Sequence, residues 1–409
     1  MLTTNKYIQL KETFATISKA IGYIPRLPKE NYSQTIAILL NNLNDAVMEI
    51  NLELLDSSSV NLYNTHFLDD KITDYAYKDT LTVQYMLWHK TMLEVLERQY
   101  NAQNSLDEKF IKLMDYIELT NFEDIVEKAK SSLCAQENSL QNQICSYYQI
   151  LREMWGTLDI SNNQYDVIIN RVTELKEHTE DFIWLYNRLE DWRSKLVLVN
   201  MLYNWITLDL NFLREMKEAN FTDYFDLDLV KCGDNEVVVD LGTWIGDSTL
   251  NYIKTYGKYK KIYCYEIDEM NMNQAKKNLA GYPNIEFRRK GAGSKNGTMY
   301  MQRYKDQSCN KVVATNTGKE IEIVSIDTDI REKITLIKMD IEGGEQDALL
   351  GCKRHIEAEA PKLLISVYHN NEDIWKIPRM VDEIRQDYHF YLRSNGAQYG
   401  PAEIVMFAL

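Results

Sequence analysis

Glycine is distributed unevenly along this chain and divides it into two parts of different character. Of the sixteen glycines, only Gly22 and Gly156 precede Gly233. A long stretch without helix breakers favours helices. After Gly233, short apolar runs alternate with helical ones, which is typical of a mostly parallel, doubly wound sheet. We therefore expect an all-helical domain at residues 1–220 and an α/β domain at residues 221–409.

Apolar residues in the first part recur every three or four positions, which places them on one face of a helix. One such stripe comprises Ile36, Leu40, Leu43, Val47, Ile50 and Leu54. Similar stripes lie near residues 76–100, 106–130, 139–155 and 164–216. The histidines of this part, at 66, 89 and 178, lack the spacing of metal ligands, so we interpret them as structural.

The net charge restricts the partners of the chain. A formal charge of -15 and a pI near 5.0 oppose sequence-independent binding to nucleic acid or to anionic lipid. The six cysteines include no C-x-x-C pair and are expected to be reduced, buried thiols. The sequence shows neither a signal-peptide pattern nor an apolar run long enough to span a bilayer. We predict a cytoplasmic protein that binds no nucleic acid.

Seven strands are expected in the second part, with a β-hairpin inserted after the third. The predicted strands are residues 236–241, 261–266, 284–289, 334–340, 362–368, 388–393 and 403–408, and the hairpin pairs residues 297–304 with 318–326.

The first strand leads into a glycine loop, Asp240-Leu241-Gly242-Thr243-Trp244-Ile245-Gly246-Asp247-Ser248. Its D-x-G-x-x-x-G spacing differs from the G-x-G-x-x-G of dinucleotide sites. An acid at the start of such a loop suits an ammonium group, and Glu266 at the end of the second strand suits ribose hydroxyls. Both groups occur in S-adenosylmethionine, which we expect as the ligand. The alternative is an ordinary strand-turn-helix without a ligand.

The fourth strand delivers three carboxylates close together: Asp340, Glu342 and Glu345 follow Lys338 within seven residues. Crowded acids raise one another's pKa unless a cation compensates, and Lys338 is two residues before Asp340, on the same face of the strand. Such a group serves as a general base, as a metal-ligand set, or as acids that stabilise the first turn of the next helix.

The fifth strand ends at His369, and consecutive strands on one side of a switch point are neighbours. His369 and Asp340 should therefore reach the same crevice. Imidazole is the usual proton acceptor near neutral pH, which makes His369 a candidate general base rather than a structural histidine.

Four segments give the second domain a resemblance to the FkbM family of S-adenosylmethionine-dependent methyltransferases. They are the loop from Asp240 to Ser248, Val324-Ser325-Ile326-Asp327, the segment Ile337-Lys338-Met339-Asp340-Ile341-Glu342-Gly343-Gly344-Glu345, and Ser366-Val367-Tyr368-His369. The resemblance covers about residues 221–409 and leaves the first 180 residues unexplained. It implies a Rossmann-like class I methyltransferase sheet and O-methylation, most often of a sugar, in glycan or polysaccharide biosynthesis. Where the family often has lysine and histidine, this chain has Asn370 and Ser394.

These observations assign roles to individual residues. For catalysis we select His369, Asp340 and Lys338, with His369 or Asp340 as the base. No metal is expected, and a magnesium ion on Asp340 and Glu342 is the less favoured alternative. The cofactor is expected to contact Asp240, Gly242, Thr243, Trp244, Gly246, Asp247, Ser248, Glu266, Ile267, Ala292 and Asp340.

Two other functions stay open at this point. An N-methyltransferase acting on an amino sugar or another small molecule would need less help from a base, and a non-catalytic scaffold would use the helical part as its working surface. The helical domain is expected to recognise the acceptor, or to mediate association with a second copy or a partner protein.

Overall fold

The computed structural model of this chain describes residues 106–217, 224–226, 228–302, 311–313, 319–396 and 398–409. The stripes expected at residues 36–54 and 76–100, and the histidines at 66 and 89, lie outside the described residues. From Lys112 to Leu409 the chain forms one compact unit. The helices of residues 112–216 therefore belong to the same unit as the sheet, whereas a domain boundary near residue 220 stays a prediction.

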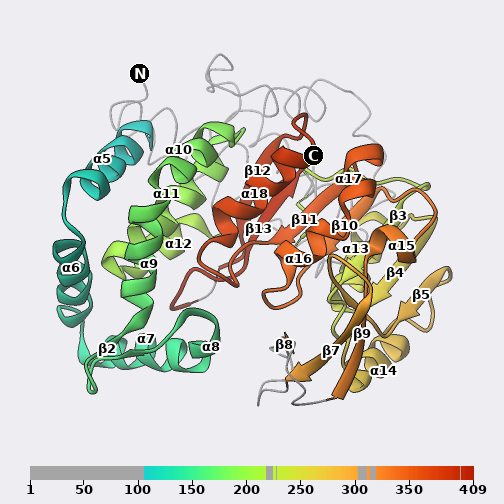
Figure 1. Cartoon of the computed structure of the whole chain (residues 1–409), viewed down its shortest axis with the longest axis horizontal. Coiled ribbons are helices and arrows are strands. Elements are labelled where there is room, and N and C mark those ends of the chain that lie inside the picture. Colours follow the sequence, from blue (N-terminus) through green and yellow to red (C-terminus); the bar gives the residue numbers. More distant parts are fainter. Residues whose placement is uncertain (1–105, 218–223, 227, 303–310, 314–318, 397) are drawn as a thin grey trace, which may run out of the picture. The chain divides into compact units, whose positions relative to one another are not determined.

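The part before the sheet is helical, with one short hairpin (Figure 1). Its helices are α5 Leu106–Leu119, α6 Phe122–Cys134, α7 Asn138–Ile150, α8 Arg152–Trp155, α9 Asp166–Glu177, α10 Thr179–Arg188, α11 Trp192–Thr207 and α12 Leu210–Met216, and the hairpin pairs β1 Leu158–Asp159 with β2 Gln164–Tyr165. The apolar stripe of residues 106–130 is divided between two helices. Asn121 separates them because its side chain caps α6 by accepting a hydrogen bond from the Asp124 amide.

All seven strands predicted from the sequence are present and form one sheet. They are β3 Val237–Leu241, β4 Lys261–Tyr265, β5 Ile285–Arg288, β10 Leu336–Met339, β11 Lys362–Ser366, β12 Phe390–Ser394 and β13 Ile404–Ala408. The spatial order is β12-β13-β11-β10-β3-β4-β5, and β13 pairs antiparallel with both neighbours while the strands from β11 to β5 are parallel. The order reverses between β3 and β10, which makes their carboxyl ends the switch point of the sheet.

The connections of the sheet are helical, apart from an inserted second sheet. The helices are α13 Asp247–Tyr256, α14 Glu269–Asn278, α15 Ile326–Asp329, α16 Glu345–Leu350, α17 Lys353–Glu359 and α18 Asp373–Ile384. The insertion orders its strands β6-β9-β7-β8, with β6 Gly291–Ala292, β7 Gly297–Gln302, β8 Lys311–Val313 and β9 Lys319–Val324. The expected hairpin is confirmed, since β7 and β9 pair antiparallel.

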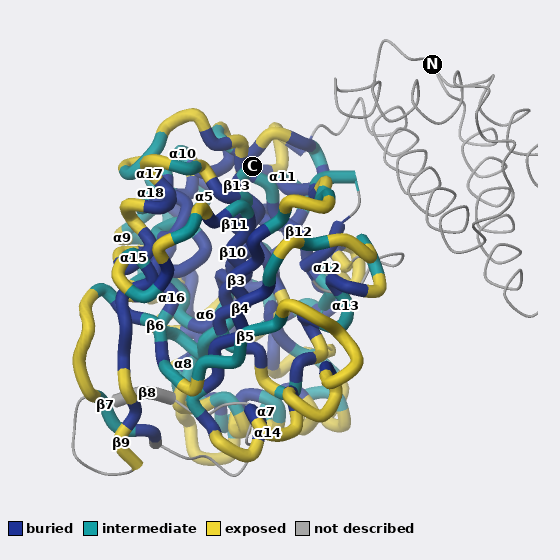
Figure 2. The backbone as a smooth tube through the Cα atoms, turned by 90° about the vertical axis from the view of Figure 1, so that its right-hand side faces the viewer, coloured by how far each residue is buried: buried dark blue, intermediate teal, exposed yellow. Residues whose placement is uncertain are grey.

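The centre of the sheet is the most buried part of the described chain (Figure 2). Every residue of β3, β10 and β13 is buried. Val238, Ile262, Leu336 and Leu364 pack together across four neighbouring strands. This burial explains why these strands read as continuous apolar runs rather than as alternating patterns.

Helix α11 joins the helical part to the sheet through buried polar contacts. The Ser194 hydroxyl accepts a hydrogen bond of 2.9 Å from the Leu392 amide of β12. The guanidinium of Arg393, also on β12, is 2.6 Å from Asp191 and 2.9 Å from Asp226. Because a buried charge is costly unless it is paired, these ion pairs fix α11 against the edge of the sheet.

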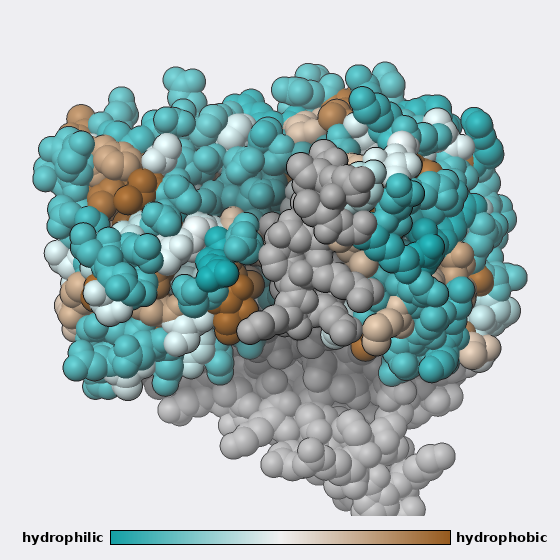
Figure 3. Space-filling model, turned by 60° about the horizontal axis from the view of Figure 1, so that its bottom comes forward, coloured by the Kyte–Doolittle hydropathy of each residue, from teal (hydrophilic) through white to brown (hydrophobic). Residues whose placement is uncertain are grey.

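Hydrophilic side chains cover most of the described surface on the face shown in Figure 3, and hydrophobic ones form separate small groups. Within the described residues, no helix combines the length and the apolar character needed to cross a bilayer. The described cysteines carry free thiols, and they include the exposed Cys134, contrary to the expectation that all are buried.

Candidate functional site

A cavity of about 860 Å³ lies at the switch point of the sheet. Its size lies within the range of ligand sites, about 300–1,000 Å³. The walls come from the loops after β3, β4 and β10, from the inserted sheet, and from the α7–α8 region. Predicted site residues on these walls are Gly242, Trp244, Asp247, Ser248, Glu266, Ile267, Ala292, Lys338 and Asp340.

The loop after β3 requires both of its glycines. Gly242 has φ 79°, and a Cβ there would lie 1.7 Å from the carbonyl oxygen of Asp340. Gly246 has φ 84°, and a Cβ there would lie 2.9 Å from Leu279 Cδ1. The positive φ angles and the close approaches both exclude larger residues. The loop thus packs tightly against β10 and α14, and α13 begins at Asp247.

Asp240 lies behind this loop, not on the cavity wall. Its Oδ2 accepts hydrogen bonds from Ser248 Oγ at 2.7 Å and Thr249 Oγ1 at 2.6 Å, and its Oδ1 is 3.1 Å from Lys338 Nζ. Burial alone would raise the pKa of Asp240, but the charge of Lys338 and these hydrogen bonds lower it. The Asp240 carboxylate anchors the first turn of α13. Thr243 is likewise fully buried, and contact of either residue with the cofactor stays a prediction.

Lys338 is held in place from two sides. Besides Asp240, its ammonium group donates a hydrogen bond of 2.8 Å to the carbonyl of Gly242. Burial would lower the pKa of Lys338, but Asp240 and Asp340 raise it. The charged and paired Lys338 thus fixes the loop after β3, and a catalytic role for it stays a prediction.

Glu266 stands at the end of β4, as predicted, with its carboxyl group on the cavity wall. Burial raises the pKa of Glu266 to about 7. Its Oε1 accepts a hydrogen bond of 2.7 Å from the amide of Asp268, which caps α14. One carboxylate oxygen is thereby fixed, and the group is oriented for accepting hydrogen bonds from a diol.

Asp340 presents its carboxylate to the cavity between two buried groups. Tyr224 Oη donates a hydrogen bond of 2.5 Å to Asp340 Oδ2, and His369 Nε2 is 3.3 Å from Asp340 Oδ1. Burial, and then the charge of Asp340, raise the pKa of Tyr224 well above its usual value. Tyr224 thus stays a neutral donor that holds Asp340 as an acceptor. The adjacency of His369 and Asp340 follows the sequence prediction, because β10 and β11 are neighbours.

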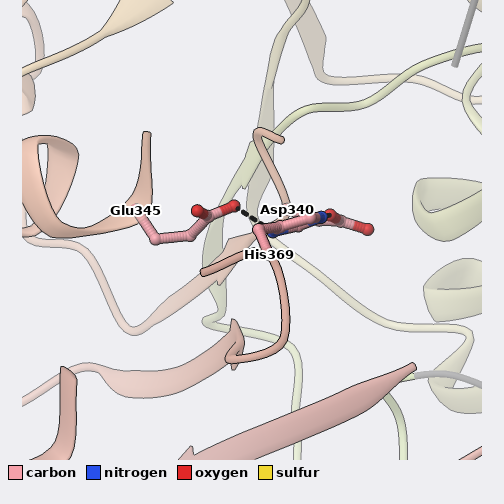
Figure 4. Close-up of side chains that lie close together, drawn as sticks. All are labelled: Asp340, Glu345 and His369. Carbon is pink, nitrogen blue, oxygen red and sulfur yellow. Dashed lines mark ion pairs between the residues drawn. The ribbon is translucent and has the colours of Figure 1, made fainter. Parts of the chain in front are cut away.

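His369 is fully buried, with its ring between Glu345 and Asp340 (Figure 4). Its Nδ1 lies 2.9 Å from Glu345 Oε1, and its Nε2 lies 3.7 Å from Glu342 Oε2. Burial would lower the pKa of His369, but Glu345, Asp340 and Glu342 raise it to about 10. The imidazole therefore carries a proton at neutral pH. Between the two candidate bases, this geometry favours Asp340, and His369 acts as the cation behind it.

Glu345 has both the structural role expected for it and a second one. It opens α16, and its Oε1 accepts a hydrogen bond of 2.8 Å from the amide of Ile341. The same oxygen faces His369 Nδ1. Glu345 is thus the carboxylate that orients the histidine, a role that its position in the sequence did not reveal.

One possible ligand atom from each of Asp340, Glu345 and His369 lies within 4.8 Å of the other two, close enough to hold a metal ion. The less favoured magnesium site on Asp340 and Glu342 stays a prediction. A metal ion bound to Asp340 would compete with the proton on His369, because the imidazolium already supplies a positive charge to Asp340 and Glu342.

Tyr224 is a site residue that the sequence analysis missed, since 116 positions separate it from Asp340. The α7–α8 region was likewise expected only as a helical stripe, yet it contributes Tyr147, Leu151 and Met154 to the wall. A tyrosine in an irregular segment and an apolar helix face carry no local signal of a site.

The strand order with its one antiparallel strand, together with a ligand loop after β3, defines the class I methyltransferase fold. Residues 232–399 match the family model of the methyltransferase FkbM domain. The chain therefore carries an FkbM-family methyltransferase domain at its C-terminal side, as the sequence predicted.

One solved structure of an FkbM methyltransferase agrees with this assignment. The chain is similar to methyltransferase FkbM from Methylobacillus flagellatus KT, at 25% identity and a TM-score of 0.52, over 67% of this chain and 72% of that one. Weaker likenesses include an rRNA methylase from Streptococcus thermophilus, with 16% identity, a TM-score of 0.30, and 50% and 94% of the two chains covered. Fibrillarin from Aeropyrum pernix, determined with S-adenosyl-L-methionine, has 11% identity, a TM-score of 0.28 and coverage of 44% and 70%. A search among curated proteins finds no significant match.

Proposed function

We propose that the cavity binds S-adenosylmethionine and that the protein transfers the methyl group to a hydroxyl of a small acceptor, most readily a sugar. The observation that carries this proposal is the Asp340 carboxylate, which faces the cavity while Tyr224 and His369 hold it from behind. An oriented carboxylate at the switch point of a methyltransferase sheet is suited to accept the proton of an attacking hydroxyl.

The cofactor would lie across the carboxyl ends of β3 and β4. Glu266, on this wall, would accept hydrogen bonds from the ribose hydroxyls, and the loop with Gly242 and Trp244 would enclose the aminocarboxypropyl end. Ile267 and Ala292, which line the same side, supply an apolar surface beside the adenine. Of the predicted contact residues, Asp240, Thr243 and Gly246 do not line the cavity and would support the site indirectly, and Asp340 would serve the acceptor rather than the cofactor.

Methyl transfer from a sulfonium is an in-line displacement in which the protein mainly orients the two reactants. The acceptor oxygen forms a bond to the methyl carbon while the carbon–sulfur bond breaks and its electron pair returns to sulfur, giving S-adenosylhomocysteine. The hydroxyl proton moves to the Asp340 carboxylate. The positive charge of His369 and the hydrogen bond from Tyr224 keep Asp340 in the orientation that receives this proton.

A sugar acceptor would need a base, because a neutral hydroxyl group is a poor nucleophile until its proton is removed. We further propose that the reaction belongs to glycan or polysaccharide biosynthesis and takes place in the cytoplasm, where the free thiols of the described cysteines would stay reduced. N-methylation of an amino sugar remains the second candidate, since an uncharged amine needs no base.

Two measurements on the purified full chain test this proposal. Calorimetry with S-adenosylhomocysteine should show binding that Glu266→Ala weakens and Asp340→Asn leaves nearly unchanged. With methyl-labelled S-adenosylmethionine and a panel of sugars, Asp340→Asn should lower turnover about 10²- to 10⁴-fold. Wild-type turnover in Asp340→Asn would refute the assigned base, and the absence of S-adenosylhomocysteine binding would refute the whole function.

A further inference from the structure

The helical part of the chain contributes three side chains to the cavity that the proposed transfer reaction does not use. They are Tyr147, Leu151 and Met154, which we call the α7–α8 wall. We infer that this wall recognises an apolar group, and that the acceptor is a sugar joined to such a group, as in a glycoside with an aromatic or alkyl aglycone. The inference rests on the proposed function and specifies its substrate class.

The α7–α8 wall lies on one side of Asp340, and Glu266 lies on the other. In the sheet, β10 with Asp340 after its end separates β11 from β3 and β4, and Glu266 follows β4. The α7–α8 region is attached on the β11 side, because Trp155 Nε1 donates a hydrogen bond of 2.9 Å to the carbonyl of Tyr368, just beyond β11. A molecule that reacts in front of Asp340 while the cofactor occupies the Glu266 side would therefore extend toward the α7–α8 wall.

The chemistry of this wall suits an apolar group better than a hydroxyl. Residues 138–155 are all described, and their charged side chains do not line the cavity. Leu151 and Met154 are half-buried, so part of each side chain stays available to a ligand. A sugar hydroxyl removed from water against these two side chains would lose hydrogen bonds without gaining a partner. An apolar group in the same place would gain free energy from burial, and the unbranched methionine can adapt to its shape.

The aromatic member of the wall is held in place by its neighbours. The ring of Tyr147 lies edge-on to Tyr148, with 5.4 Å between centroids, and 6.2 Å from Trp155. A Cβ on Gly400 would lie 2.5 Å from Tyr147 Cε1, so the backbone there closes against the ring. Buried Arg171 fixes the rings behind it, because its Nη1 donates a hydrogen bond of 2.7 Å to Tyr148 Oη and its guanidinium carbon lies 5.3 Å from the Trp155 ring centre. A ring that is already ordered stacks on a ligand at little entropic cost.

Calorimetry on the full chain saturated with S-adenosylhomocysteine tests the inference. The ligands are matched methyl and phenyl β-glycosides of glucose, galactose and mannose. Within a pair that binds, the phenyl glycoside should bind at least about tenfold more tightly, because its ring is buried against the α7–α8 wall while a methyl group buries little surface. Labelled S-adenosylmethionine then measures methylation of the same compounds.

Two variants and a control assign this preference to the wall. Leu151→Asn and Met154→Gln keep the size of the side chain and make it polar, so each should remove most of the preference for phenyl glycosides. Ile150→Asn is the matched control, since Ile150 is 72% exposed and does not line the cavity. It should keep the full preference. Binding of S-adenosylhomocysteine shows that each variant is folded.

The outcomes separate this inference from the proposed function. Equal affinities within the pairs, or no binding of any glycoside, would overturn the inference. An unchanged preference in both Leu151→Asn and Met154→Gln would also overturn it, because the phenyl group would then be recognised elsewhere. If the phenyl glycosides bind more tightly but none is methylated, the recognition surface stands and the proposed transfer to a sugar hydroxyl is wrong.

Discussion

Replacing Glu345 by Gln tests how the site holds the charge of His369. The His369–Glu345 pair is fully buried, at 2.9 Å between Nδ1 and Oε1. Breaking a buried ion pair by removing one partner costs about 3–5 kcal/mol. A second histidine–glutamate pair supplies a matched control, because His355 Nδ1 lies 2.7 Å from Glu359 Oε2 in α17, away from the cavity. Glu345→Gln and Glu359→Gln should therefore both lower the free energy of unfolding.

The two variants should differ in how stability depends on pH. The pKa of His369 is raised from 6.5 to about 10. Its proton therefore stabilises the folded state fully below about pH 6.5, and this stabilisation is lost as the pH rises toward 10. Since one pKa unit corresponds to about 1.4 kcal/mol, several kcal/mol of stability depend on this proton. Glu345→Gln removes the carboxylate that raises the pKa most, so its stability should fall less over this interval.

Urea unfolding followed by circular dichroism at a series of pH values measures this difference. The wild type and Glu359→Gln should lose stability together as the pH rises from about 6.5 to about 10, while Glu345→Gln shows a smaller loss. Identical pH dependence in all three proteins would refute the conclusion that His369 is an imidazolium held by Glu345.

Three further predictions concern the cavity wall. Tyr224→Phe removes the hydrogen bond to Asp340. Since a hydrogen bond to a charged group contributes about 1.5–3 kcal/mol, turnover should fall roughly 10- to 150-fold while cofactor affinity stays unchanged. An unchanged turnover would contradict this role of Tyr224. Gly242→Ala places a Cβ 1.7 Å from the Asp340 carbonyl oxygen, so calorimetry should show little or no S-adenosylhomocysteine binding. The pKa of Glu266 is about 7 in the unliganded protein, and its ionised form would accept the ribose hydrogen bonds. The affinity for S-adenosylhomocysteine should therefore rise as the pH increases through 7. Glu266→Gln should lack this pH dependence.

The centre of the sheet could be predicted from the sequence because β3 and β10 are fully buried and therefore read as apolar runs. The position of Asp340 beside His369 could also be predicted, since both residues follow the carboxyl ends of neighbouring strands, β10 and β11. These inferences depend on where a strand ends, which is encoded locally, and on the rule that consecutive strands on one side of the switch point are neighbours.

Side-chain direction and long-range pairing could not be predicted in the same way. Asp240 faces Lys338, Ser248 and Thr249 rather than the cavity, and that choice depends on a lysine contributed by the adjacent strand. The proton on His369 depends on three carboxylates that surround it only in the fold. A capping asparagine, Asn121, outweighed the apolar periodicity that suggested one continuous helix.

The most direct test of the central claim is a crystal structure of the full chain with S-adenosylhomocysteine bound. We predict the ribose hydroxyls on Glu266, the aminocarboxypropyl end in the loop after β3, and the sulfur atom turned toward the space in front of Asp340. A nucleoside bound elsewhere on the chain, or a sulfur atom separated from Asp340 by the protein wall, would contradict the claim that this cavity brings the methyl donor and the proton acceptor together.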